Sequence, residues 1–196
     1  MPALQFDIRE LQRLRQRFDP KDVEKALRWA VDATSRKAAT HISRDIRDAY
    51  AIKAGDIKRR LKIERVRRDA TRALLYTGRR LPLEQFKPGT KRVRVTATSS
   101  TGKRFKTTRK GATVRVRKDK GRQLVKGGWY AKGHILRRAD RSDNTSEPRI
   151  QFGPSIPGMV AHPETIEGAQ ELVRRDLPEQ FSNRMDYILN KKAGLS

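Results

Sequence analysis

The sequence has no cysteine, few aromatic residues and no long apolar run. The absence of cysteine excludes disulfide bridges, thiol nucleophiles and cysteine-ligated zinc. Aromatic residues are 6% and hydrophobic residues 35% of the 196 positions, so an isolated chain can bury only a modest core. We therefore expect assembly or a ligand to add stability.

Long apolar segments are missing as well. No run of 18 or more apolar residues occurs, and residues 1–10 lack the apolar core of a signal peptide. We therefore expect no membrane partner and no export from the cytosol.

Acidic residues are scarce relative to basic ones, with 22 Asp and Glu against 47 Lys and Arg, a net charge of +25. Such an excess destabilises the compact chain by self-repulsion and favours binding to polyanions, with nucleic acid first and an anionic membrane surface second. The charge is concentrated in residues 87–141, which hold 19 basic and 2 acidic side chains, whereas residues 142–196 hold 6 and 8. The centre is therefore predicted to be the working surface, between near-neutral ends.

The first element that the sequence predicts is a helix over residues 20–50. Asp19 is a favoured N-cap residue, and Pro20 follows at the preferred first helical position. Small and apolar residues then recur every three or four positions, which indicates an amphipathic helix with a narrow, Ala-rich stripe. Such a stripe predicts packing on a sheet or on a neighbouring subunit, and the candidates for subunit packing are Leu27, Ala30, Ala38, Ile42 and Ile46.

The basic centre, residues 61–152, is predicted to be a β region. Residues 92–95 and 113–117 alternate valines with arginines, so each segment would present valines on one face and cations on the other. Residues 98–112 have turn residues and little apolar content, which fits a flexible loop or an extended hairpin tip. Other segments with strand-like composition are 63–66, 70–76, 127–130, 135–136 and 149–152, and 81–86 is predicted to be an edge strand or an extended connection.

The C-terminal part, residues 163–192, is predicted to be helical. Pro163 and Glu164 are typical of a helix start, and Pro178 is expected to break or kink the helix, so that a second helix follows it. No internal repeat is visible. The sequence therefore predicts one α+β domain over residues 1–196, with an antiparallel sheet between terminal helices.

Catalytic and metal-binding patterns are not found. The three histidines, His41, His134 and His162, have no metal-ligand spacing, and residues 87–141 offer only Asp119 and Asp140 as carboxylates. Residues 101–104 end like a phosphate-binding loop but lack its first glycine and the hydroxyl residue after Lys103. We therefore expect no enzyme, no cofactor and no bound metal.

The interpretation that remains is contact between Lys and Arg side chains and the backbone of a polyanion. No helix-turn-helix, zinc-finger or basic-zipper pattern occurs, so sequence-specific reading of DNA is not supported. The alternative for the arginine-containing segments 92–95 and 113–117 is a solvated sheet face whose charges only prevent pairing with the edge of another sheet. The candidates for contact with nucleic acid or with a neighbouring protein ring are Arg92, Arg94, Arg115, Arg117, Lys118, Lys103 and Arg104.

The order of these elements resembles the phage minor tail protein Z family. The resemblance extends from about residue 20 to residue 190 and rests on the order of an Ala-rich helix and four later segments. These are IKRRLKI at 57–63, LPLEQF at 81–86, GGWYAKG at 127–133 before a basic pair, and GPSIPGM at 153–159.

The resemblance implies a virion protein, made in the host cytoplasm, that completes the head-proximal end of a long phage tail. It implies sixfold rings, tail-terminator and head-completion proteins as neighbours, and double-stranded DNA in an axial channel, so that the protein joins tail to head or positions the DNA end. The basic face would then meet either the DNA or a negatively charged neighbouring ring. The alternative is a free, nonspecific nucleic-acid-binding protein, such as a ribosome-associated or packaging factor, and an enzyme acting on DNA comes third.

Overall fold

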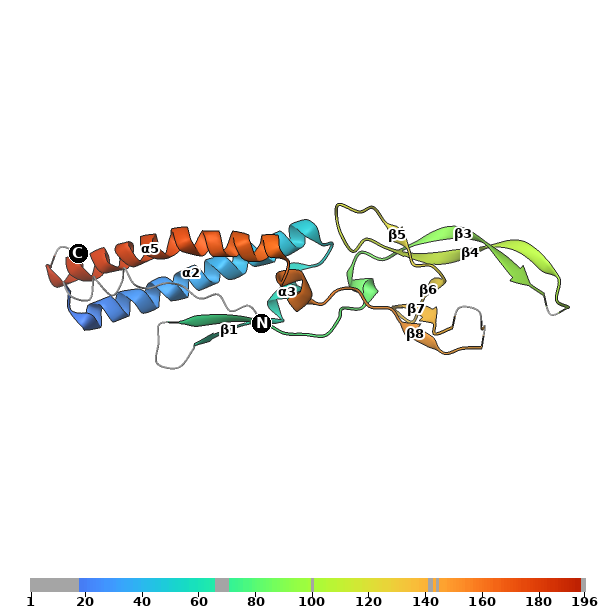
Figure 1. The fold of residues 1–196 in the computed structure, drawn as a ribbon, viewed down its shortest axis with the longest axis horizontal. Helices are drawn as coiled ribbons and strands as arrows, with labels where there is room; N and C mark the ends of the chain where they lie inside the picture. Colours follow the sequence, from blue (N-terminus) through green and yellow to red (C-terminus); the bar gives the residue numbers. More distant parts are fainter. Residues whose placement is uncertain (1–17, 66–70, 100, 141–142, 144, 195–196) are drawn as a thin grey trace. The chain divides into compact units, whose positions relative to one another are not determined.

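A computed structural model describes residues 18–65, 71–99, 101–140, 143 and 145–194 of the chain (Figure 1). The fold is α+β, as predicted, with long helices near both ends of the chain and antiparallel strands between them. The residues form two compact units. The helical unit comprises Met1–Asp45, Ile57–Thr77 and Pro157–Ser196, and the β unit comprises Ile46–Asp56 and Gly78–Ile156.

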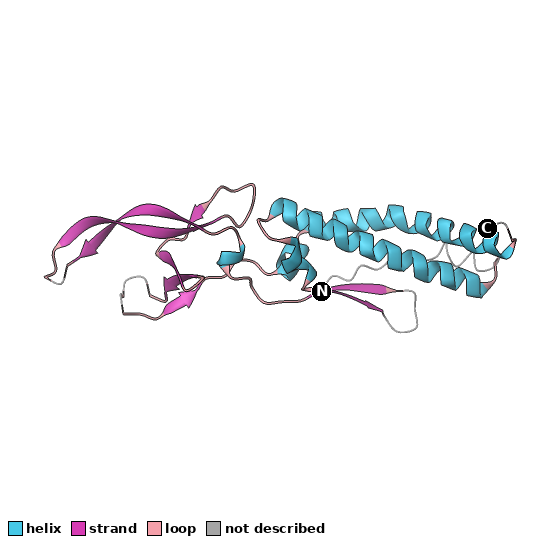
Figure 2. Cartoon of the chain, turned by 180° about the vertical axis from the view of Figure 1, so that it is seen from behind, coloured by secondary structure: helices cyan, strands magenta, loops and turns pink. Residues whose placement is uncertain are grey.

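Two helices of 30 residues dominate the helical unit, α2 (Pro20–Ala49) and α5 (Pro163–Lys192). They lie side by side in both ribbon views (Figures 1 and 2). The N-cap prediction for α2 is confirmed, because the Asp19 carboxylate accepts a hydrogen bond of 2.9 Å from the Lys21 amide. The two helices share a buried core of four α2 residues and three α5 residues: Val23, Ala26, Leu27, Ala30, Phe181, Met185 and Ile188.

The residues proposed for subunit packing are covered by the chain itself. Leu27 and Ala30 belong to the core shared with α5, and all five predicted residues are at most 5% exposed: Leu27, Ala30, Ala38, Ile42 and Ile46. The single chain therefore already buries these side chains, and a subunit contact through them stays a prediction. Helical periodicity reveals that one face is buried, but it does not tell which element buries it, and for Leu27 and Ala30 the cover comes from α5, near the other end of the chain.

The break expected at Pro178 is absent, since α5 continues through this residue. A proline inside a helix removes one hydrogen bond and costs about 3 kcal/mol. Buried residues on both sides of it, Val173 before and Phe181 after, anchor the helix to its core. Apolar packing therefore offsets the local cost, and one C-terminal helix replaces the two that were predicted.

Ion pairs join distant segments of the helical unit. Asp176 of α5 is buried and accepts hydrogen bonds from the Thr34 hydroxyl, at 3.0 Å, and from the Lys37 ammonium group. Lys192 at the end of α5 pairs with Asp22 in the first turn of α2, so the two helices run antiparallel. In the same unit, β1 (Leu61–Arg65) and β2 (Arg72–Tyr76) form an antiparallel pair, which confirms strands near the predicted positions, whereas the predicted strand residues Val66 and Ala70 lie outside the described part.

The β unit contains two three-stranded antiparallel sheets. The strands of the first are β3 (Gly89–Thr98), β4 (Arg104–Val114) and β5 (Gln123–Leu124). Those of the second are β6 (Gly128–Ala131), β7 (His134–Arg138) and β8 (Pro148–Ile150), which confirms the strands predicted near residues 127–130, 135–136 and 149–152. Short helices α3 (Ala54–Lys58) and α4 (Ile156–Val160) lie at the limits of this unit in the sequence.

The segment predicted as an edge strand or extended connection, residues 81–86, is extended only at its start, where Pro82 forms an isolated antiparallel bridge with Phe152, and it continues as a 3₁₀ helix, η1 (Leu83–Gln85). Pro82 caps it with φ of −59°, a value that the proline ring imposes. Leu81 and Phe86, which flank η1, are fully buried, and so is Ile135 of β7. The segment thus supplies core residues to the β unit in addition to this short pairing.

Candidate nucleic-acid interface

Strands β3 and β4 form a long two-stranded ribbon, paired from Gly89 opposite Thr113 to Thr98 opposite Arg104. Residues directly opposite each other in an antiparallel pair project from the same face. Arg92 lies opposite Lys110, and Thr96 lies opposite Lys106. Arg94 lies between Arg92 and Thr96 on β3 and projects from the same face. We call this side the cationic face, and its basic residues are Arg92, Arg94, Arg104, Lys106 and Lys110.

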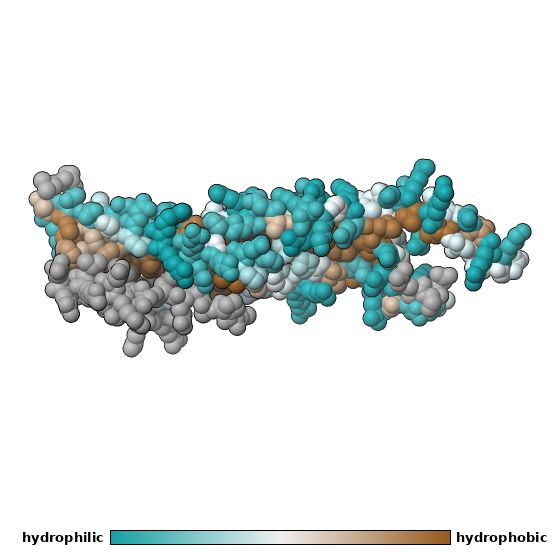
Figure 3. Space-filling view, turned by 45° about the horizontal axis from the view of Figure 1, so that its top comes forward, coloured by the Kyte–Doolittle hydropathy of each residue, from teal (hydrophilic) through white to brown (hydrophobic). Residues whose placement is uncertain are grey.

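The side chains of the cationic face are exposed and uncompensated. All five are classed as exposed, and none of them pairs with an acidic side chain in the described part of the chain. In the space-filling view, long hydrophilic side chains project from the ribbon beside a strip of apolar residues (Figure 3). Unpaired charge of one sign on a narrow strip raises the local potential and attracts counterions or an anionic partner.

The spacing of these charges suits a regular polyanion. Alternate residues of a strand are about 7 Å apart, so the stretch from Arg92 to Thr98 covers about 20 Å. Duplex DNA carries one phosphate charge per about 1.7 Å of its axis, or about a dozen over that length. Threonines at positions 90, 96, 98 and 108 stand among the cations on the same face and add hydroxyl donors.

On the opposite face of the ribbon, β3 contributes three apolar residues that follow Lys91. Val93, Val95 and Ala97 are half-buried, while their neighbours Arg92 and Arg94 are exposed. The alternation predicted for residues 92–95 is therefore confirmed. Because the side-chain period of a strand is two, the same backbone places cations on one side and packing residues on the other.

The second predicted basic strand, residues 113–117, is correct only for its first two residues, since β4 ends at Val114. The following backbone pairs elsewhere: the Ala51 amide donates to the Val116 carbonyl at 2.9 Å, and the Lys118 amide donates to the Ala49 carbonyl at 2.8 Å. This pairing takes residues 115–118 out of the ribbon.

Arg115 and Arg117 consequently have contacts within the chain. The Arg115 guanidinium donates to the Lys118 carbonyl at 2.5 Å. The Arg117 guanidinium lies 5.6 Å from the centroid of the Tyr50 ring, and its Nε donates to Asp119 at 3.0 Å. This hydrogen bond lowers the pKa of the Asp119 carboxyl, because it stabilises the charged form. Arg115, Arg117 and Lys118 therefore lie outside the cationic face, and their contact with nucleic acid or with a neighbouring ring stays a prediction.

Lys103 lies in the turn that closes the ribbon and is exposed. Gly102 has φ of 81°, a left-handed conformation that glycine adopts at no steric cost. Of the two possibilities for residues 98–112, the hairpin is the one observed. Sequence reasoning missed Lys106 and Lys110, whose membership of the face follows from their register opposite β3; Thr107 and Thr108 were the available signal for a strand.

Each of the three histidines lies beside one carboxylate. His41 Nδ1 is 2.9 Å from Asp45, His134 Nδ1 is 2.5 Å from Glu84, and His162 Nδ1 is 3.8 Å from Glu164. Among the described residues, no three His, Cys, Asp or Glu side chains gather as metal ligands would. The described helices also include none that is long and apolar enough to cross a membrane.

Comparison with known proteins gives no match to a protein-family model, to a curated protein or to a solved structure.

Proposed function

We propose that the chain is a structural, non-catalytic protein that binds the backbone of double-stranded nucleic acid through the cationic face of the β3–β4 ribbon. The observation that carries the proposal is the row of five exposed cations without acidic partners in the described part of the chain. Repulsion between the unpaired cations destabilises the free protein. A bound polyanion offsets this repulsion, and the release of its counterions adds to the favourable free energy of binding.

The ribbon favours phosphate contact over base reading. Lys, Arg and Thr side chains bind phosphate oxygens without distinguishing sequences. A two-stranded ribbon is narrow enough to approach a duplex along its major groove, with phosphates on either side. We therefore expect binding that is nearly independent of sequence and strongly dependent on salt.

The resemblance to phage minor tail protein Z supports a setting for this activity, namely a ring at the head-proximal end of a phage tail with DNA in its channel. Because Leu27, Ala30 and the other predicted packing residues are buried within the chain, contacts between subunits would use other side chains. Mass photometry and negative-stain microscopy test this setting, and a chain that stays monomeric at every salt and protein concentration contradicts it. The free nucleic-acid-binding protein is then the remaining candidate.

The binding proposal is tested by neutralising four cations at once, as R92Q/R94Q/K106Q/K110Q. Affinity for a fluorescent duplex is measured by anisotropy over a range of salt concentrations. Each lost phosphate contact lowers the slope of log K against log salt by about 0.9, so we expect the slope to become shallower by about 3 to 4.

The matched control is K21Q/R174Q/R175Q/K191Q, which removes the same charge from exposed positions of α2 and α5. We expect this control to keep most of the affinity and of the salt slope. Equal losses of affinity and salt slope in the two variants would mean that net charge alone drives binding. That result would contradict the proposal that the ribbon binds the duplex.

A further inference from the structure

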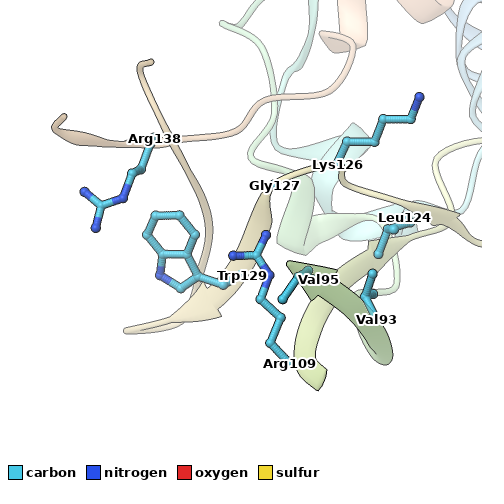
Figure 4. Close-up of a pocket in the computed structure, with 8 residues that line it drawn as sticks. All are labelled: Val93, Val95, Arg109, Leu124, Lys126, Gly127, Trp129 and Arg138. Atoms are coloured by element: carbon cyan, nitrogen blue, oxygen red, sulfur yellow. The ribbon is translucent and has the colours of Figure 1, made fainter. Parts of the chain in front are cut away.

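A hollow of about 330 Å³ lies between the apolar face of the ribbon and the second sheet of the β unit (Figure 4). Val93 and Val95 of β3, Leu124 of β5 and Trp129 of β6 provide its apolar walls. Gly111 of β4 brings the walls together, because a Cβ at this position would lie 2.9 Å from a Val93 methyl group and 3.0 Å from a Leu124 methyl group. The volume is at the lower end of the range of about 300–1,000 Å³ typical of small-ligand sites.

Cations border the apolar walls of the hollow. Arg109, Lys126 and Arg138 line it, and none of its described lining residues is acidic. In Figure 4, Arg109 and Arg138 lie on opposite sides of the Trp129 indole. The Arg138 guanidinium is 5.9 Å from the Trp129 ring centroid and donates to the Ser146 carbonyl at 2.7 Å, which orients it beside the ring.

This combination selects for a ligand that is both aromatic and anionic. An indole beside aliphatic side chains offers a stacking surface for a planar ring, and such stacking accepts any base. Guanidinium and ammonium groups at its border bind phosphate oxygens. A nucleotide carries both parts in one residue, whereas an apolar peptide segment would leave the three cations unused.

We propose that the hollow binds one unpaired nucleotide of a single-stranded segment or end, with its base against Trp129 and its phosphates toward Arg109 and Lys126. The inference rests on the proposed function, because the nucleotide arrives as part of the nucleic acid that the cationic face holds. The ribbon then has two roles: one face binds the duplex backbone, and the other helps to enclose a base.

Fluorescence of Trp129 tests the inference directly. The chain has two tryptophans, so W29F makes Trp129 the single reporter while keeping an aromatic side chain in the helical core. Three probes are titrated into the full-length W29F chain: a short oligothymidylate, an abasic oligonucleotide of the same length, and a duplex. We expect oligothymidylate to quench Trp129 and to bind about 10-fold more tightly than the abasic strand, as loss of one stacked base predicts.

Two variants separate a stacking role from a general effect. Trp129→Leu in the otherwise unchanged chain should abolish the preference for oligothymidylate over the abasic strand and leave duplex affinity unchanged. Tyr130→Leu is the matched control, since Tyr130 is the next residue of β6 and is 49% exposed, but its side chain projects from the other face of the strand. It should keep the preference.

The outcomes for the two proposals differ. Equal affinity and equal quenching with the oligothymidylate and abasic strands would overturn the base-binding hollow, and duplex binding that persists would leave the ribbon proposal intact. Absence of binding to all three probes at low salt would overturn the proposed function and the hollow together.

Discussion

The helical unit and the cationic face of the β unit differ in how their basic side chains are paired. In the helical unit, Lys37 pairs with the buried Asp176 of α5, and the Arg72 guanidinium, only 5% exposed, lies 2.5 Å from Asp32. These pairs join segments that are 139 and 40 residues apart in sequence. In the β unit, Arg92 and the other members of the cationic face have no such partner within the described chain.

The difference separates charge that stabilises a fold from charge that is kept for a partner. The sequence of the β unit has 24 basic and 7 acidic side chains, a net of +17, whereas that of the helical unit has 23 and 15, a net of +8. Repulsion within the β unit destabilises it, and packing around Leu81, Phe86 and Ile135 must offset that cost. We therefore expect substitutions in the two units to affect different measurements: stability for the helical unit, and binding for the ribbon.

The largest effect on stability is expected for Phe181→Ala. Phe181 is 5% exposed in the core between α2 and α5, and removing a buried Phe side chain costs about 3–5 kcal/mol. Urea unfolding measures the loss, and duplex affinity measured under folding conditions should stay unchanged. The control is Tyr187→Ala on the same helix, where the side chain is 50% exposed and a much smaller loss is expected. A large fall in duplex affinity for folded Phe181→Ala would contradict the expectation that substitutions in the helical unit change stability and not binding.

An effect of opposite sign is expected for Pro178→Ala. The replacement restores one backbone hydrogen bond donor inside α5, and we expect the free energy of unfolding to rise by about 1–3 kcal/mol. Ser182→Ala, an exposed change on the same helix, should shift it by less than about 0.5 kcal/mol. If Pro178→Ala instead lowers stability, the local backbone geometry at the proline contributes to the packing of α5.

The smallest effect concerns Tyr76 at the end of β2. Burial raises the pKa of its phenol to about 12, and its hydroxyl is buried without a hydrogen-bond partner in the described structure. A raised folded pKa gives stability that is present below pH 10 and is lost as the pH rises from about 10 to 12. Tyr76→Phe should therefore lose less stability over this window than the parent chain, and it should differ by less than about 1 kcal/mol at neutral pH.

Tyr130→Phe in the β unit is the control for the alkaline measurement, because this side chain is 49% exposed. We expect its unfolding profile against pH to match that of the parent chain. An alkaline loss that is identical in Tyr76→Phe and in the parent would show that lysine titration accounts for it.

The parts of the fold that could be predicted are those set by local rules. Asp19 and Pro20 mark the start of α2, and the alternation at residues 92–95 correctly assigns Val93 and Arg94 to opposite faces. The errors arise where distant residues decide the outcome. Pro178 stays inside a helix because α2 packs against its neighbours, and 81–86 folds as η1 because its apolar side chains enter a core.

The candidate site was half predictable for the same reason. Arg92, Arg94 and Arg104 were among the expected contacts, but Lys106 and Lys110 join them only through strand register, which a single strand's pattern does not reveal. Arg115 and Arg117 were misplaced, because the backbone near Val116 pairs with Ala51 instead of continuing the ribbon. The hollow around Trp129 combines residues from five strands and the loop between β5 and β6, so no local signal could indicate it.

The register of the ribbon also restricts how its length can change. Inserting one residue into β3 after Gly89 would turn Arg92 and Arg94 toward the hollow and expose Val93 and Val95, whereas inserting two would restore both faces. Whether the number of inserted residues is odd or even is thus as important as composition in this segment. Sequences that diverge while keeping the two binding surfaces should gain or lose ribbon residues in even numbers, or in matched pairs on the two strands.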